Sequence, residues 1–91
     1  MTAAPPTTDA IASTIAQLLG ARAADASICP SEVARALAPD HWRALMPQIR
    51  AVAAELAGAG SLRITQSDEE ITPAALLAGQ TRGPIRLRRR R

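Results

Sequence analysis

The chain has 91 residues, enough for one hydrophobic core and too few for two, so we expect a single domain. Hydrophobic residues make up 47% of it, but Trp42 is the only aromatic residue, which leaves a core of Ile, Leu and Val. All eleven basic residues are Arg, and with eight Asp and Glu they give a net charge of +3. Arg88 to Arg91 supply four positive charges, so without them the charge falls from +3 to −1. Attraction to phosphate would therefore depend on one end of the chain.

Cys29 is the only cysteine, which excludes an intrachain disulfide. The first residues show no basic segment followed by an apolar run, so no signal peptide is expected. No segment approaches the roughly 18 consecutive apolar residues of a membrane span. We expect a cytoplasmic protein with no membrane partner.

Residues 1 to 8 are rich in Pro and Thr and lack periodic hydrophobic residues, so they are interpreted as a disordered leader. A first helix follows, with Thr8 or Asp9 as its N-cap and Gly20 at its end. Its apolar face has helical spacing and consists of Ile11, Ile15, Leu18 and Leu19.

Pro30 in a first helical turn and Pro39 as a stop signal predict a second helix over Pro30 to Ala38. Ser27 and Ile28 just upstream are predicted to form a brief extended segment. Asp40 is the predicted N-cap of a third helix, which ends near Gly58. Its apolar stripe is Trp42, Leu45, Ile49, Val52, Ala53 and Leu56.

Pro47 interrupts this third helix and cannot donate a backbone hydrogen bond. A kink is one outcome, and a restart is the other. We favour a short helical turn followed by a separate long helix from about Met46.

After Gly60 the apolar period changes to two, because Leu62 and Ile64 alternate with polar residues, as in a strand with one buried face. Ser67 to Glu70 is predicted to be a turn, and Ile71 to begin a short return strand. Thr72 is predicted to cap a helical turn from Pro73 to Leu77. A last strand, Pro84 to Arg88, would turn Ile85 and Leu87 inward, and residues 89 to 91 would form a basic tail.

Three helices followed by a small antiparallel sheet define an α+β fold and, in this order, a winged helix-turn-helix domain over residues 9 to 88. The stretches ICPSEVARAL, WRALMPQIRAVAAELAGAG and GPIRLR also resemble a small bacterial family, the domain of unknown function three-two-five-three. The resemblance covers about residues 28 to 88. It implies a winged-helix-like fold and brings no activity, substrate or site residues.

DNA binding is the leading functional hypothesis, with the third helix in the major groove. Its predicted outward residues include Gln48, Arg50, Ala51, Ala54 and Glu55, with Arg43 near the groove. Gln48 suits adenine, and Arg50 suits guanine or a phosphate. A solvated helix surface explains the same residues, and Glu55 would repel the phosphate backbone.

Arginines of the two strands are predicted to project from one solvent-facing side as a phosphate-binding stripe. Its strand residues are Arg63, Arg86 and Arg88. Arg82 in the loop before the last strand and Arg89 to Arg91 of the tail extend the stripe. The acidic residues of the predicted turn oppose this function, or else pair with the arginines. The alternative is therefore a protein-interaction module on the same scaffold, including a homodimer.

Catalysis finds little support, because one Cys and one His have no spacing that brings a nucleophile to a base. Cys29 is placed before a helix and His41 at the start of another, and together they fall short of a zinc site. We expect a non-enzymatic protein with no metal, cofactor or small-molecule substrate.

Overall fold

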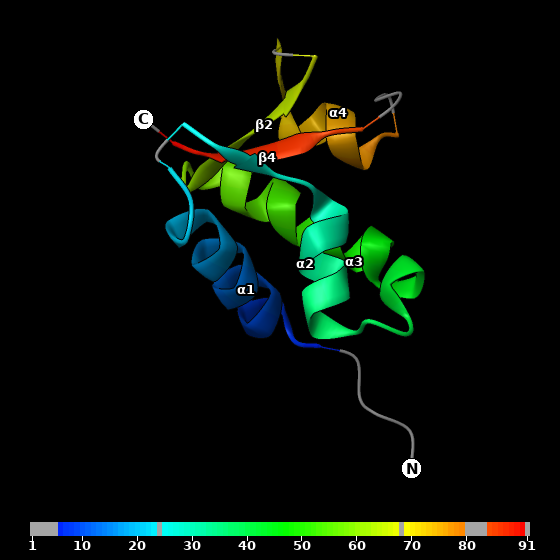
Figure 1. The fold of residues 1–91 in the computed structure, drawn as a ribbon. Coiled ribbons are helices and arrows are strands. Elements are labelled where there is room, and N and C mark those ends of the chain that lie inside the picture. The colour runs from blue at the N-terminus through cyan, green and yellow to red at the C-terminus, as the bar shows by residue number, and fades with distance from the viewer. Residues whose placement is uncertain (1–5, 24, 68, 80–83, 91) are drawn as a thin grey trace.

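The computed structural model describes residues 6–23, 25–67, 69–79 and 84–90 of the chain. Along the chain the elements are α1 (Thr8–Gly20), β1 (Ser27–Ile28), α2 (Pro30–Leu37), α3 (Trp42–Gly58), β2 (Leu62–Gln66), β3 (Glu69–Ile71), α4 (Pro73–Leu77) and β4 (Arg86–Arg89). The strands form one antiparallel sheet in the order β1-β4-β2-β3. Figure 1 shows this sheet lying across one end of the helices α1, α2 and α3. The expected α+β fold with a small antiparallel sheet is confirmed.

The first helix has the predicted extent but a different cap. The hydroxyl of Thr7 accepts a hydrogen bond from the backbone N–H of Ala10 at 3.1 Å, and Thr7 itself has an extended backbone. Thr8 and Asp9 lie inside the first turn, so their prediction as the N-cap is wrong. Asp9 stands there beside the positive end of the helix dipole, where a carboxylate is favourable.

The third helix is continuous, and the predicted restart near Met46 is wrong. α3 runs from Trp42 to Gly58 with Pro47 inside it, and its N-cap position is His41 rather than Asp40. Pro47 removes one backbone donor, but its ring is exposed, while Leu45 and Ile49 on either side are buried in the core. Packing of these neighbours keeps the chain helical through the proline.

The core lies between the sheet and the three long helices. The register places Ile64 opposite Leu87, and both are fully buried on the face that meets the helices. Ile85 and Leu87 point inward as the alternation predicts. Each of these three helices contributes an apolar stripe to the core. The largest fully buried side chains of the three stripes are Ile11 and Ile15 of α1, Val33 of α2 and Ile49 of α3.

The short extended segment at Ser27 becomes strand β1, which pairs with β4. The last strand therefore lies in the interior of the sheet, between β1 and β2. Among the described residues, no helix is both long enough and apolar enough to cross a membrane.

The hairpin between β2 and β3 is tighter than predicted. Glu69 and Glu70 pair with Gln66 and Thr65 as part of β3, so Ser67 to Glu70 is not a four-residue turn. Ser67 has a φ of 50°, a left-handed conformation that reverses the chain in few residues. Asp68 lies outside the described residues. The predicted helical turn is confirmed as α4, and the Thr72 hydroxyl caps it by accepting from the N–H of Ala75.

Candidate nucleic-acid interface

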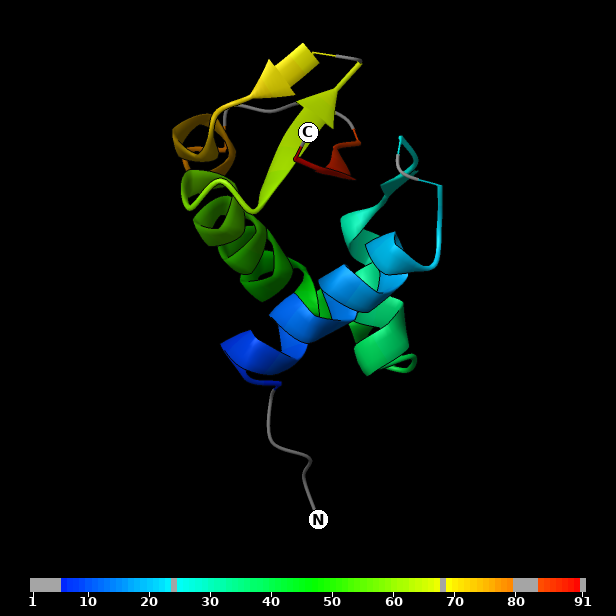
Figure 2. The same cartoon turned by 90° about the vertical axis from the view of Figure 1, so that its left-hand side faces the viewer.

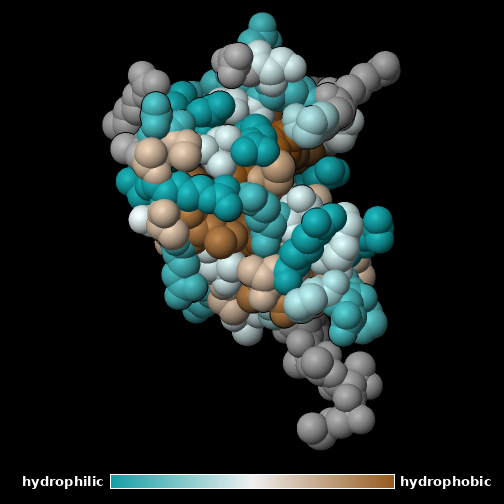
Figure 3. All heavy atoms as spheres, in the orientation of Figure 1, coloured by the Kyte–Doolittle hydropathy of each residue, from teal (hydrophilic) through white to brown (hydrophobic). Residues whose placement is uncertain are grey.

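The arginines of the sheet share one face, as their alternation with buried residues predicts. Arg63 of β2 stands opposite Arg88 of β4, and Arg86 stands opposite Thr65. All three arginines are half-buried, and Thr65 beneath them is only 4% exposed. The guanidinium groups therefore lie along the sheet instead of extending into solvent. Figure 3 shows hydrophilic side chains across this end of the molecule, with a hydrophobic area below them.

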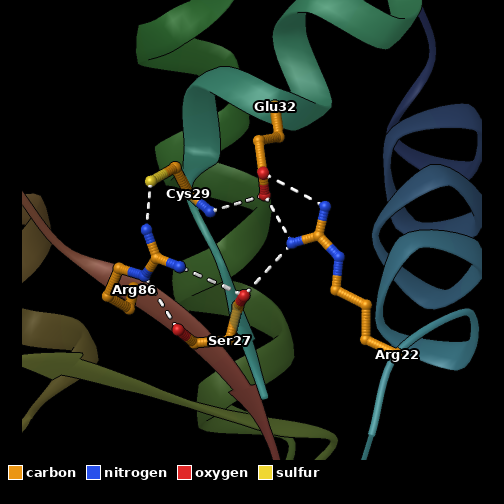
Figure 4. A network of polar contacts seen from close by, with 5 residues as sticks. All are labelled: Arg22, Ser27, Cys29, Glu32 and Arg86. Carbon is orange, nitrogen blue, oxygen red and sulfur yellow. Dashed lines mark hydrogen bonds and ion pairs between the residues drawn. The ribbon is translucent and has the colours of Figure 1, made fainter.

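Arg86 directs all three of its guanidinium nitrogens at β1 and the residue after it (Figure 4). It donates to the hydroxyl of Ser27 at 2.8 Å, to the carbonyl of Ser27 at 3.2 Å and to the Cys29 sulfur at 2.6 Å. These bonds attach β4 to the start of α2. Arg86 is a structural tie in this arrangement, because each of its three guanidinium nitrogens already donates to a partner within the chain.

A second guanidinium meets the same segment from the opposite side (Figure 4). Arg22 binds both carboxylate oxygens of Glu32 at 3.0 and 3.1 Å, and it also donates to the Ser27 carbonyl at 3.2 Å. Glu32 in turn accepts from the backbone N–H of Cys29 at 3.0 Å, which stabilises the first turn of α2. The hydrogen bonds from Arg22 lower the pKa of Glu32 below its ordinary value, and the same contact raises the pKa of Arg22.

The arginines near the C-terminus also bind within the chain. Arg88 donates to the Thr65 hydroxyl at 3.1 Å and to the carbonyl of Asp25 at 3.0 Å. Arg89 belongs to β4 and donates to the Leu19 carbonyl, at the end of α1, at 2.6 Å.

Two further arginines beside them carry similar contacts. Arg90 pairs with Glu70 at 3.5 Å and donates to the Leu62 carbonyl at 3.3 Å. Arg63 donates through Nε to the Arg89 carbonyl at 3.2 Å. Arg82 lies outside the described residues. The stripe predicted for phosphate is thus largely a set of internal ties, and the acidic strand β3 does pair with one of its arginines.

The outward side of α3 is covered over its second half. Ala54 lies on the opposite side of the helix from Leu45, Val52 and Leu56, yet it is only 2% exposed. Helix α4 packs against α3, and Figure 2 shows it at the C-terminal end of that helix. The prediction that Ala54 faces outward is therefore wrong. The apolar periodicity of the α3 sequence identifies only the stripe that faces the core. Packing of α4 buries a second side of α3, which that periodicity does not show.

Gln48, which was predicted to contact adenine, has a hydrogen-bond partner within the chain. Its side-chain amide donates to the carbonyl of Pro6 at 2.7 Å and is half-buried. This bond ties the segment before α1 to the side of α3. The amide has a structural partner 42 residues away, which nothing in the local sequence indicates.

The first half of α3 keeps its outward face open. Arg43 and Arg50 are exposed, and seven residues place them on one face about 10 Å apart along the helix axis. Neither forms an ion pair with any carboxylate of the described chain. These two predicted residues are brought together as an accessible basic surface.

A third guanidinium joins this surface from α2. The Cζ atom of Arg35 lies 4.4 Å from the centroid of the Trp42 ring, and that of Arg43 lies 4.5 Å from it. Arg35 is exposed and has no ion pair in the part of the chain that the structure describes. Arg35, Arg43 and Arg50 are called the α2–α3 basic face below. An open hollow of about 560 Å³ adjoins it, lined by residues 39 to 44.

Sequence reasoning missed Arg35. The signal was weak, because Arg35 and Trp42 lie on different helices and only the short turn between α2 and α3 brings them together. The sequence does contain one indication of this contact. Trp42 follows the predicted turn directly, and arginines stand one residue after it and seven residues before it.

Cys29 and His41 are the two remaining candidate residues. Cys29 is half-buried beside Arg86, and His41 is exposed at the start of α3. Within the described ranges, no three side chains among His, Cys, Asp and Glu stand close enough together to hold a metal ion.

The comparison with family models agrees with the resemblance seen in the sequence. The model described as "Protein of unknown function (DUF3253)" matches residues 8–90, and the chain belongs to this family. The match spans α1 through β4 and includes Arg89 and Arg90. A comparison with curated proteins found no match.

Proposed function

We propose that this protein binds double-stranded nucleic acid, and DNA in particular, through the α2–α3 basic face. In this proposal the fold is a winged helix-turn-helix. Its support is the short turn that joins α2 to α3, the pairing of β1 with β4, and the β2–β3 hairpin beside them. In such domains the second helix lies in the major groove, where its side chains contact base edges, while the first helix crosses the phosphate backbone.

The observation that carries the proposal is the open first half of α3. Arg43 and Arg50 stand on one face without acidic partners among the described residues, and α4 covers the half that follows. Two guanidinium groups without acidic partners among the described residues thus lie on the open face of the proposed recognition helix. Glu55, which would repel phosphates, lies more than one turn beyond Arg50.

The roles follow from position. Arg35 on α2 and Arg43 in the first turn of α3 suit phosphate contacts, since phosphates bind guanidinium groups without regard to base sequence. Arg50 lies two turns deeper along the helix, within reach of a base edge. The sheet arginines have a different role here, namely holding the fold.

The test is the affinity for a labelled mixed-sequence duplex over a series of salt concentrations. Each lost phosphate contact reduces the slope of log affinity against log salt by about 1. We expect Arg43→Gln to show this loss. Arg90→Gln is the matched control, because it removes the same charge from the sheet side of the molecule.

The control also separates this proposal from binding by the C-terminal arginines. If Arg90→Gln reduces the slope and Arg43→Gln does not, the α2–α3 basic face is not the binding surface. Absence of binding by the full chain near physiological salt would contradict the proposed function as a whole.

A protein-interaction role is the second candidate, and one observation favours it. Leu77 on α4 is 64% exposed, the only large hydrophobic side chain so exposed among the described residues. Contact between two copies through α4 would cover it. Sedimentation of the full chain and of Leu77→Ser tests this candidate, with a dimer that Leu77→Ser dissociates as the expected result.

A further inference from the structure

We propose that Trp42 is a positioning residue for nucleic-acid binding, holding the guanidinium groups of Arg35 and Arg43 where they meet phosphates. This inference rests on the proposed function and assigns its interface a residue that touches no phosphate itself. Trp42 is half-buried and packs against the core, whereas both arginines are exposed. The indole therefore has one side fixed in the fold and presents the rest of its ring to two cations.

The geometry of Arg43 indicates a specific contact. Neighbouring residues on a helix point about 100° apart and do not face each other, so an arginine beside a tryptophan normally extends away from it. The Cζ atom of Arg43 nevertheless lies 4.5 Å from the ring centroid. The side chain must bend back over the indole to reach this position.

Arg35 reaches the same ring from the other helix. Its Cζ atom lies 4.4 Å from the centroid, so two positive charges gather at one indole across the α2–α3 turn. The negative face of the aromatic ring attracts each cation, while the two cations repel each other. A phosphate bound at either guanidinium would offset part of that repulsion and accept hydrogen bonds from it.

Positioning matters because free arginine side chains lose rotamer freedom when they bind. Ordering each such side chain weakens binding by roughly twofold to tenfold. The indole orders both arginines before the nucleic acid arrives. Removing the ring should therefore weaken binding without changing how many phosphates are contacted.

The experiment measures duplex affinity over the salt series for the full chain, Trp42→Leu and Trp42→Phe. We expect Trp42→Leu to bind about tenfold more weakly at every salt concentration, with an unchanged salt slope. Trp42→Phe keeps an aromatic face and should recover affinity to within about threefold of the wild type. Thermal unfolding of each variant identifies the temperature range in which it is folded.

A combined variant tests whether Trp42 acts through the two arginines. In a chain that already carries Arg35→Gln and Arg43→Gln, adding Trp42→Leu should have no further effect on affinity. A further loss, or a reduced slope in Trp42→Leu alone, would show that the indole contacts the nucleic acid directly and would overturn the positioning role. Equal affinity of Trp42→Leu and the wild type would also overturn it.

A second measurement leaves the core untouched and applies even if Trp42→Leu does not fold. Trp42 is the only aromatic residue, so its fluorescence reports this site alone. Replacing the exposed Arg35 and Arg43 by Gln should increase quenching by acrylamide, since the guanidinium groups shield the ring. Unchanged quenching would overturn the inference, whereas a wild type that binds no duplex would overturn the proposed function and the inference with it.

Discussion

Arg89, the last residue of β4, donates from its guanidinium to the carbonyl of Leu19 at 2.6 Å, and Leu19 belongs to the last turn of α1. The same nitrogen lies 3.3 Å from the carbonyl of Arg22. The final carbonyls of a helix lack partners within it and carry the negative end of its dipole, so a guanidinium there is doubly favourable. α1 has no basic residue of its own in that turn. The cation comes from 70 residues further along the chain.

Replacing Arg89 by Gln should destabilise the protein by about 1 to 2 kcal/mol, because it removes a charged hydrogen bond and the cation at the negative end of the helix dipole. The Leu19 carbonyl would then keep only the backbone N–H of Arg22 as a donor. Urea unfolding measures the change. Duplex affinity measured on the folded variant should stay near that of the wild type. A loss of affinity without a loss of stability would instead place Arg89 in contact with phosphate.

Ending the chain after Leu87 should prevent stable folding. The truncation removes Arg88 and Arg89, which pair with residues of β1 and β2 on both sides of β4. It shortens an interior strand, whose loss exposes edges of both neighbours. We expect the far-ultraviolet circular dichroism of the truncated chain to show loss of the cooperative thermal transition.

A chain that ends after Arg90 is the control for this truncation, since it retains all of β4 and the pair between Arg90 and Glu70. Its melting temperature should stay within a few degrees of the full chain. If the chain ending at Leu87 melts at the same temperature as the control, the last strand residues contribute little to the fold.

Much of this architecture follows from local signals in the sequence. Pro30 predicts the start of α2, Thr72 the cap of α4, and the alternation from Leu62 the buried face of β2. These signals work because capping, proline geometry and strand alternation depend on residues close in sequence.

The partners of the arginines follow from tertiary contacts, which the sequence does not display. Arg86 meets Ser27 and Arg89 meets Leu19 only after β1 and β4 have paired, across 59 and 70 residues. The sequence alone does not distinguish arginines that are exposed to solvent from arginines that donate to backbone carbonyls. The predicted outward orientation of Arg50 agrees with its exposure, whereas the structural role of the sheet arginines could be recognised only from the tertiary contacts.

Ala54 tests whether α4 covers the outward side of α3. Ala54→Glu should destabilise the protein by about 2 to 4 kcal/mol, because it forces an unpaired carboxylate into a closely packed site. Ala44→Glu, at an exposed position in the first turn of the same helix, should change stability by less than about 0.5 kcal/mol. Thermal or urea unfolding compares the two. Equal effects would mean that the second half of α3 is open, as a longer recognition surface would require.

The contact between Arg22 and Glu32 predicts a pH-dependent part of the stability. Hydrogen bonds from Arg22 hold the pKa of Glu32 below its ordinary value in the folded protein. A lowered carboxyl pKa contributes stability that is fully present above the unfolded pKa, about 4.3, and is lost as the pH falls through the folded value. The relevant range is therefore acidic, and the contribution is constant around neutral pH.

Glu32→Gln isolates this contribution, because the amide keeps the shape of the side chain and cannot titrate. We expect the variant to be less stable than the wild type at pH 7, by an amount that stays constant down to about pH 5 and shrinks below about pH 4.3. Both side chains are 37% exposed, so salt should also reduce the difference. Urea unfolding at several pH values measures it. A difference that grows as the pH falls would contradict the lowered pKa, and one that does not respond to pH would assign the loss to the hydrogen bond at Cys29 alone.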